Sequence, residues 1–154
     1  ATDVKKYKNL IILKSMSKSI GIAGLRIGYI IADSKINKMI NAVRSAGDIS
    51  SFSLGVLDYF IRRPILWKQY QKEISLSKKL IEIECKKRRL KYRMTEGNFF
   101  YIFFKERFYK KIFLKLKKNK ILVKLIIKKN KYNLRITIGS IIQMKKLFRI
   151  LDKK

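Results

Sequence analysis

The densest set of reactive side chains in this sequence lies between Ser15 and Tyr29, in the run SMSKSIGIAGLRIGY. It places the amine of Lys18 among hydroxyls and glycines, with the guanidinium of Arg26 a short distance along the chain. A lysine amine attacks an aldehyde when desolvation or a neighbouring cation suppresses its charge. Ser15 and Ser17 can donate hydrogen bonds to a phosphate, which a guanidinium binds through two parallel bonds. The run therefore predicts a site for a ligand that carries both an aldehyde and a phosphate.

Two predicted strands flank this run. Residues 9–14 hold four consecutive apolar side chains between polar ones, and residues 27–32 form the second apolar stretch. Gly21 and Gly24 would let the backbone turn inside the loop between them. Two strands without a further neighbour do not make a stable sheet, so we expect them to be the edge of a larger α/β domain.

Three helices are predicted after the second strand. Ser34 is a candidate N-cap for a helix that runs to about Ala46, and Ser51 is a candidate N-cap for the next. Pro64 suits the first turn of a long helix that runs to about Leu90, because a missing N–H costs nothing there. Apolar residues at helical spacing predict the buried face of this long helix: Leu66, Tyr70, Ile74, Leu80 and Ile81.

The last third of the sequence predicts a small α/β unit. Strand-forming residues fill 98–104, a helix covers 106–118, and a second strand covers 121–127. Apolar and polar residues alternate over 134–139, which predicts a third strand before an amphipathic helix over 141–151. The predicted order of elements is βαββα.

The run around Lys18 resembles the Schiff-base lysine segment of the fold-type I aminotransferases. It is most similar to the histidinol-phosphate aminotransferase branch, in which a strand precedes S-x-S-K-x-x-G-x-A-G-L-R-x-G-Y. The resemblance implies pyridoxal 5'-phosphate as the cofactor. Lys18 would bind the cofactor's aldehyde and move the proton between the substrate Cα and the cofactor. Arg26 would bind the cofactor's phosphate, with Ser15 and Ser17 beside it.

Two later segments agree with this resemblance in order and spacing. Residues 96–100 (EGNFF) resemble the segment that opens the first strand of the family's small domain. Residues 134–139 (LRITIG) resemble the strand whose arginine takes the substrate α-carboxylate, which is the role implied for Arg135. A guanidinium suits a carboxylate because two charge-assisted bonds orient as well as bind it. For Asn98 we expect a turn or a backbone contact rather than contact with substrate.

Two segments depart from the family pattern. Residues 48–60 lack the Pro-Phe-Asn stretch that is common there, and Lys124 stands where histidinol-phosphate enzymes carry an arginine for the phosphate of the substrate. An ammonium binds phosphate as a point charge rather than a fork. The expected reaction moves an amino group between glutamate/2-oxoglutarate and histidinol phosphate or a related amino compound. The alternative is a pyridoxal-phosphate-dependent amino-acid phosphate decarboxylase of the same branch, which breaks a different bond at Cα.

The resemblance implies an α/β fold, namely the C-terminal part of the aspartate aminotransferase-like transferase fold. Residues 1–47 would end the large cofactor-binding domain, 48–90 would form interdomain helices, and 91–154 would form the small C-terminal α/β domain. The family's glycine-rich phosphate turn and Asp-Glu-Ala-Tyr segment belong to its N-terminal half and have no counterpart in this sequence. We therefore expect a C-terminal half that is inactive alone, and a homodimer for the full-length enzyme.

The formal net charge of +29 comes from 39 Lys and Arg against 10 Asp and Glu. Such an excess is typical of proteins that bind polyanions. The lysines are spread over nearly every segment and accompany abundant isoleucine, which favours AT-rich codon usage as the cause. A small basic nucleic-acid-binding protein, with a stacking platform over 99–111, is the alternative from another class. It leaves the run at 15–29 unexplained, so we expect no specific nucleic-acid partner.

Compartment and remaining partners follow from simpler features. Cys85 is the single cysteine and cannot form an internal disulfide, and the sequence shows no secretory start. Both features favour the cytoplasm. The apolar stretches around Ile11, Ile30 and Ile126 are interrupted by Lys or Arg before they reach membrane-spanning length. We expect neither a membrane partner nor a metal site.

Overall fold

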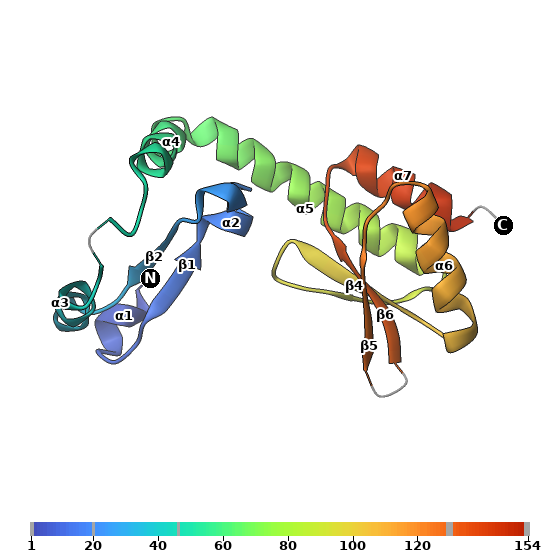
Figure 1. Ribbon diagram of the computed structural model, residues 1–154, viewed down its shortest axis with the longest axis horizontal. Helices are drawn as coiled ribbons and strands as arrows, with labels where there is room; N and C mark the ends of the chain where they lie inside the picture. The colour runs from blue at the N-terminus through green and yellow to red at the C-terminus, as the bar shows by residue number, and fades with distance from the viewer. Residues whose placement is uncertain (1, 20, 46, 129–130, 153–154) are drawn as a thin grey trace. The chain divides into compact units, whose positions relative to one another are not determined.

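The computed structural model describes residues 2–19, 21–45, 47–128 and 131–152 of the chain. It contains two compact units, residues 1–71 and 72–154, and each is described by itself (Figure 1). The long helix α5 (Pro64–Lys87) begins in the first unit and ends in the second. Pro64 opens this helix, as predicted.

The first unit contains both strands that the sequence predicted, and the structure shows that they pair with each other in antiparallel fashion. Strand β1 (Ile12–Ser15) pairs with β2 (Gly28–Ile31). The connection between them contains two short elements that the sequence analysis treated as loop, the helix α2 (Met16–Ser19) and the 3-10 helix η1 (Ala23–Leu25). The other helices of the unit are α1 (Asp3–Lys6), α3 (Ser34–Ala42) and α4 (Ser51–Arg62).

The N-cap of α3 lies one residue earlier than predicted. The Oδ1 atom of Asp33 accepts a hydrogen bond from the backbone N–H of Lys35 at 3.1 Å. An N-cap side chain accepts from the second or third helical N–H, so Asp33 caps the helix and Ser34 is its first residue. The helix ends at Ala42, and the predicted end at Ala46 lies outside the described residues.

The N-cap of α4 is shifted in the same way. The Oγ atom of Ser50 accepts from the backbone N–H of Ser53 at 3.2 Å, and the two hydroxyl oxygens lie 2.9 Å apart. The predicted cap, Ser51, is instead the first helical residue. Both misplaced caps sit next to a second residue of a good capping type, so composition alone does not separate the two positions.

The second unit is a four-stranded antiparallel sheet with the strand order β3-β4-β6-β5. Its elements are β3 (Lys91–Met94), β4 (Phe99–Phe104), α6 (Glu106–Lys118), β5 (Lys124–Lys128), β6 (Lys131–Thr137) and α7 (Ile141–Asp152). The predicted βαββα order is present from β4 onward. Strand β5 begins at Lys124 rather than at the predicted Ile121, and β6 begins before the predicted Leu134.

Strand β3 is the element that the sequence analysis missed. It is four residues long and lies at the edge of the sheet, where Lys91 and Arg93 are exposed while Tyr92 and Met94 are half-buried. Short edge strands with charged residues are common in natural sheets, because charge discourages pairing with other chains. The same charges interrupt the apolar pattern, so a run of apolar residues does not predict this strand.

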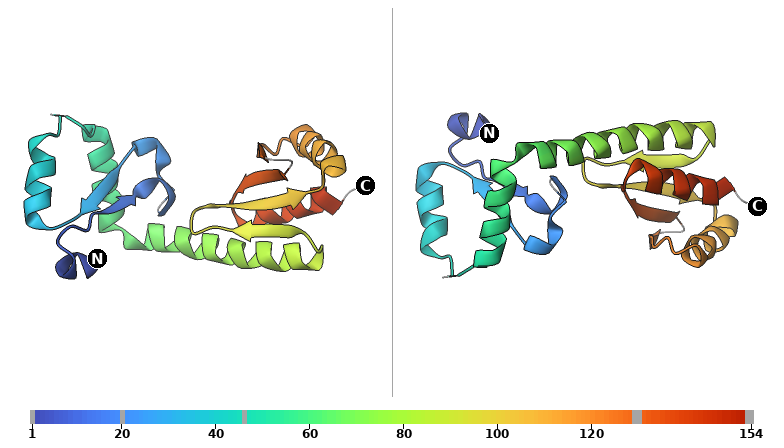
Figure 2. Two further views of the ribbon diagram at one scale, coloured as in Figure 1. Left: turned by 90° about the horizontal axis from the view of Figure 1, so that it is seen from below. Right: turned by 90° about the horizontal axis from the view of Figure 1, so that it is seen from above.

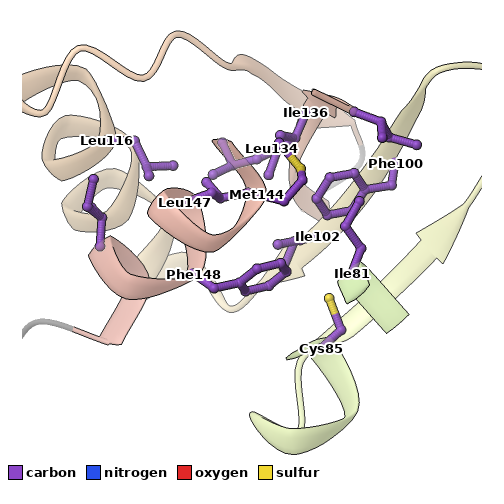
Figure 3. Close-up of a cluster of buried hydrophobic side chains, with 12 residues drawn as sticks. Ile81, Cys85, Phe100, Ile102, Leu116, Leu134, Ile136, Met144, Leu147 and Phe148 are labelled. Carbon is purple, nitrogen blue, oxygen red and sulfur yellow. The ribbon is translucent and has the colours of Figure 1, made fainter. Parts of the chain in front are cut away.

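The core of the second unit lies on one face of its sheet, which α5 and α7 cover from the same side (Figures 1 and 2). Figure 3 shows side chains from the sheet and from α5, α6 and α7 in this cluster. Its fully buried members are Ile81, Cys85, Phe100, Ile102, Leu116, Leu134, Leu147 and Phe148. Burial among these apolar groups raises the pKa of the Cys85 thiol to about 12. This core holds the sheet that carries Arg135.

The predicted buried face of α5 is divided between the two units. Ile81 is fully buried in the second unit, where Ile74 and Leu80 pack against its core. Leu66 and Tyr70 are half-buried residues of the first unit. Each unit therefore uses some of the predicted apolar positions of α5.

Candidate active site

Lys18 lies on α2, the single helical turn that follows β1 directly. Two contacts join the ends of the connection around it. Ser15 pairs with Gly28 at the end of the two strands, and the Met16 N–H donates to the Ile27 carbonyl at 3.1 Å. The side chain of Lys18 is exposed. The strand pair thus presents this amine at its end, on a short and firmly connected turn.

The two predicted phosphate donors lie next to each other at the start of α2. The Oγ atom of Ser15 accepts from the backbone N–H of Ser17 at 3.2 Å. Ser15 is exposed and Ser17 is half-buried. Bonds of this kind, from a backbone N–H to a serine two residues earlier, stabilise the first turn of a helix. They bring both hydroxyls to the same turn as the amine of Lys18.

Gly21 turns the chain after α2 with a φ of +80°, which favours glycine. A Cβ atom there would lie 3.0 Å from Cζ of Tyr70, so the ring of this α5 residue packs closely on the turn. The glycine was predicted to turn the chain. Its aromatic neighbour was not assigned to the site, because the contact joins residues that are far apart in sequence.

Arg26 takes the left-handed conformation (φ 55°, ψ 35°) at the end of η1, which is costly for a residue with a side chain. Gly24, which was predicted to help turn the loop, does not have a positive φ among the described residues. The Nη1 atom of Arg26 donates to the carbonyl of Ala23 at 3.4 Å, so its exposed guanidinium bends back toward its own loop. A strained arginine beside the Lys18 turn is an observation that motivates a functional role.

Arg26 also lines an open cleft of about 580 Å³ within the first unit. Tyr29 from β2 and Asn37 and Asn41 from α3 line the same cleft. Arg44 is a second guanidinium there, and its Nε atom is paired with Asp48 Oδ2 at 2.9 Å. Ile30, Ile40 and Ile49 also line the cleft, so polar and apolar side chains both surround Arg26.

Gly28 is required by the geometry of the strand pair. A Cβ atom at this position would lie 2.8 Å from the carbonyl oxygen of Lys14, closer than real Cβ atoms approach oxygen. The backbones of β1 and β2 can approach at this point because glycine has no side chain. Since the pair joins both ends of the connection, Gly28 indirectly sets the position of Lys18.

The two predicted substrate-binding residues lie in the second unit and are direct neighbours. Lys124 in β5 pairs with Arg135 in β6, and directly opposed residues point to the same face of a sheet. Lys124 is exposed and Arg135 is half-buried. The guanidinium carbon of Arg135 lies 4.0 Å from the centre of the Phe99 ring. Two cations thus lie side by side on the face opposite the core.

The site residues named from the sequence therefore fall into two groups. Ser15, Ser17, Lys18 and Arg26 share one strand connection of the first unit. Lys124 and Arg135 share one cross-strand pair of the second unit. Asn98 contributes its backbone, since its carbonyl accepts from the Ile138 N–H at 2.8 Å.

The described part of the chain shows neither a cluster of metal ligands nor a helix that could span a membrane. Its His, Cys, Asp and Glu side chains form no group of three or more that could hold a metal ion. Its helices include none with the length and apolar character needed to cross a membrane.

Comparison with known proteins places this geometry in a family. The family model described as "Aminotransferase class I and II" matches residues 1–151. Histidinol-phosphate aminotransferase 2 of Haemophilus influenzae is 34% identical over 103 residues, which is 67% of this chain and 28% of that protein. The chain thus matches about a quarter of the length of this curated relative.

Two solved structures show the same fold. Histidinol-phosphate aminotransferase from Sinorhizobium meliloti, in complex with pyridoxal-5'-phosphate, superposes with a TM-score of 0.76 at 18% identity, over 92% of this chain and 40% of that one. L-threonine-O-3-phosphate decarboxylase from Porphyromonas gingivalis superposes with a TM-score of 0.72 at 19% identity, over 98% and 48%. The predicted α/β aminotransferase-like fold class is confirmed.

The family match identifies the cofactor as pyridoxal phosphate, because aminotransferases of class I and II use it. It covers both groups of predicted site residues, from the Lys18 turn to the strand of Arg135. The resemblance inferred from the run at 15–29 is confirmed by the family model and by the named relatives. This chain belongs to the aminotransferase class I and II family, with histidinol-phosphate aminotransferases among its relatives.

Proposed function

We propose that this chain supplies the cofactor-anchoring lysine and the substrate-binding cations of a pyridoxal-phosphate-dependent aminotransferase. The observation that carries the proposal is the connection between β1 and β2. It holds the amine of Lys18, the hydroxyls of Ser15 and Ser17 and the guanidinium of Arg26 within one short segment. An amine beside phosphate-binding donors fits a ligand that has an aldehyde and a phosphate.

When bound, the cofactor supplies an electron-withdrawing ring that makes the proton on the substrate Cα acidic. The residues of this chain would bind the cofactor and move the proton. Arg26 holds the cofactor's phosphate through its planar fork, and Ser15 and Ser17 donate to the same phosphate. The Nζ atom of Lys18 would hold the cofactor through its aldehyde carbon, with loss of water. Once the substrate's amine has displaced it from that carbon, the freed Nζ atom would accept the proton from Cα and return it at the former aldehyde carbon, on the other side of the nitrogen.

Arg135 and Lys124 are proposed to bind the substrate. Arg135 takes the α-carboxylate of glutamate or 2-oxoglutarate through two parallel bonds, which orient the substrate for proton transfer. Lys124 meets the phosphate of histidinol phosphate, or of a related amino compound, as a point charge. Their pairing across β5 and β6 places the two cations side by side on one face of the sheet, which supports a shared part in binding anionic substrates.

Transamination is favoured over decarboxylation by the sequence relatives. The curated relatives that match this chain are named histidinol-phosphate aminotransferases. The decarboxylase is similar in fold at 19% identity, which supports the fold and no particular reaction.

We propose in addition that the full-length enzyme is a homodimer, with domain boundaries near residues 47 and 90.

Reductive trapping tests the role of Lys18. The polypeptide, as its source organism produces it, is incubated with pyridoxal phosphate and borohydride and digested for mass spectrometry. The cofactor is expected on the peptide that contains Lys18. Lys18→Ala should abolish the modified peptide and reduce turnover of glutamate at least about 100-fold, because a positioned acid–base group contributes that much or more.

Lys14→Ala is the matched control for this experiment. Lys14 is an exposed lysine on the adjoining strand, so its removal changes the local charge equally and leaves the proposed anchor in place. We expect trapping at Lys18 to be unchanged in this variant. Specific trapping at a different lysine of the unaltered protein would refute the proposal.

A further inference from the structure

The face of the second sheet that lies opposite the core carries a row of cations and rings. Arg93 pairs with Tyr101, Tyr101 with Arg135, and Arg135 with Lys124, so the four side chains lie side by side across all four strands. Phe99 precedes Tyr101 on the same face of β4, diagonal to Arg135. Diagonal neighbours across antiparallel strands are within reach of long and aromatic side chains.

The guanidinium of Arg135 lies on the ring of Phe99. Its carbon is 4.0 Å from the ring centre, which is van der Waals contact, and the negative face of the ring attracts the cation. A free arginine side chain has many rotamers, and fixing it costs conformational entropy. A ring beneath the guanidinium selects the few rotamers in which the planar group lies flat on that ring.

The backbone of Phe99 is itself fixed from several sides. The hydroxyl of Thr95 donates to the Phe99 carbonyl, and the Ile138 N–H donates to the carbonyl of Asn98 at 2.8 Å. The Nζ atom of Lys78 donates to the carbonyl of Thr95 at 3.1 Å. The turn between β3 and β4 is therefore tied to both α5 and the end of β6, and the ring leaves it in a defined direction.

Gly97 leaves the space that this ring occupies. A Cβ atom at Gly97 would lie 3.2 Å from Cε1 and 3.4 Å from Cδ1 of Phe99, which is tighter than usual contact. An alanine there would push the ring by a few tenths of an ångström. The rings of Phe99 and Tyr101 also meet edge to face, with centres 5.6 Å apart and planes at 86°. Gly97 and Tyr101 thus both limit the orientations open to the ring.

We propose that Phe99 is a positioning residue for Arg135, and that Gly97 leaves the room its ring needs. The inference rests on the carboxylate role proposed above for Arg135. Two parallel bonds to a carboxylate require a guanidinium whose plane is already set. Phe99 sets that plane before the substrate arrives, without touching the substrate itself.

This role is tested by steady-state kinetics, measured on the polypeptide in the form that its source organism produces. Phe99→Leu is expected to raise the KM for 2-oxoglutarate about fivefold to tenfold, which corresponds to the loss of one partly buried cation–ring contact. The kcat should stay within about twofold, because the lost interaction orients the carboxylate equally in the ground state and the transition state. Phe99→Tyr, which keeps the ring face, should restore the original KM.

Phe103→Leu is the matched control. Phe103 lies on the same strand and the same face, is half-buried like Phe99, and has its ring centre 6.4 Å from that of Tyr101. The same substitution there removes the same volume and should leave the KM within about twofold. Equal effects of Phe99→Leu and Phe103→Leu would reduce Phe99 to a packing residue and overturn the inference.

Arg135→Leu separates this inference from the proposed function. An unchanged KM in Arg135→Leu would refute the carboxylate role, and the positioning role would fall with it. A raised KM in Arg135→Leu, together with an unchanged KM in Phe99→Leu, would overturn the positioning role alone.

Nuclear magnetic resonance gives a readout that is independent of turnover. The Hε proton of Arg135 should resonate upfield because of the Phe99 ring current, and the shift should vanish in Phe99→Leu and remain in Phe103→Leu. In Gly97→Ala the shift should decrease as the ring moves. An Arg135 signal without a ring-current shift in the unaltered protein would overturn the inference, whatever the kinetics.

Discussion

The two units of this chain bury their apolar residues to very different extents. The second unit packs one face of its sheet against three helices in a continuous core. In the described part of the first unit, the buried apolar residues are Val4 and Ile27, and large side chains are exposed, among them Val43 (83%), Leu13 (75%) and Phe52 (74%). The continuous apolar core and the candidate Lys18 turn thus lie in different units.

The largest consequence of this contrast is expected in hydrogen exchange. Amide protons of β4 and β6 should exchange at least about a thousandfold more slowly than those of β1 and β2, because core strands exchange only through global unfolding. The intact chain is placed in deuterated buffer, and mass spectrometry of its peptides then measures the exchange of both strand sets in the same sample. Similar protection of the two strand sets would contradict the contrast.

A core substitution should sharpen the same contrast. Phe100→Ala, which empties a fully buried position of β4, should lower the free energy of unfolding of the second unit by about 3–5 kcal/mol. Urea titration followed by circular dichroism checks this value. The control is Ile27→Ala, a truncation of a buried residue in the first unit, which should leave the main transition within about 0.5 kcal/mol.

The smallest effect concerns an ion pair at the surface of the second unit. Arg88 Nε donates to Asp152 Oδ1 at 2.7 Å, and this bond holds the pKa of Asp152 below its ordinary value. Stabilisation by this carboxylate is therefore present above a pH of about 4 and is lost as the pH falls through the lower pKa of the folded state. Asp152 is half exposed, so the contribution is at most about 1 kcal/mol.

Asp152→Asn tests this assignment. The variant should unfold more easily than the original at pH 7, and the difference should shrink as the solution is acidified below a pH of about 4. Asp58→Asn is the control, because Asp58 pairs with Arg62 on the exposed surface of the first unit. A difference between Asp152→Asn and the original protein that stays constant with pH would contradict the assignment.

Local patterns predicted much of the fold. Strand β4 and helices α6 and α7 have strong periodicity and lie close to their predicted bounds. The pattern failed where local chemistry was ambiguous. Strand β3 alternates charged and apolar residues over only four positions, and α2 lies within a run rich in serine and glycine. Neither carries a periodic apolar signal long enough to be distinguished from loop.

The candidate site was predictable in its residue types but not in its arrangement. The run around Lys18 and the strand of Arg135 could be named from motifs. The pairing of Arg135 with Lys124 depends on the register between β5 and β6, which no local pattern specifies. The contacts of Phe99 with Arg135 and of Tyr70 with Gly21 join distant parts of the sequence and required the fold.

The buried thiol of Cys85 makes the second unit report on its own opening. Only the thiolate reacts readily with alkylating reagents, and a pKa of about 12 leaves almost none of it at neutral pH. Because this buried thiol is the chain's single cysteine, its alkylation requires an opening of the core around α5. The rate of Cys85 alkylation therefore measures how often that core opens, and it does not depend on motions of the Lys18 turn.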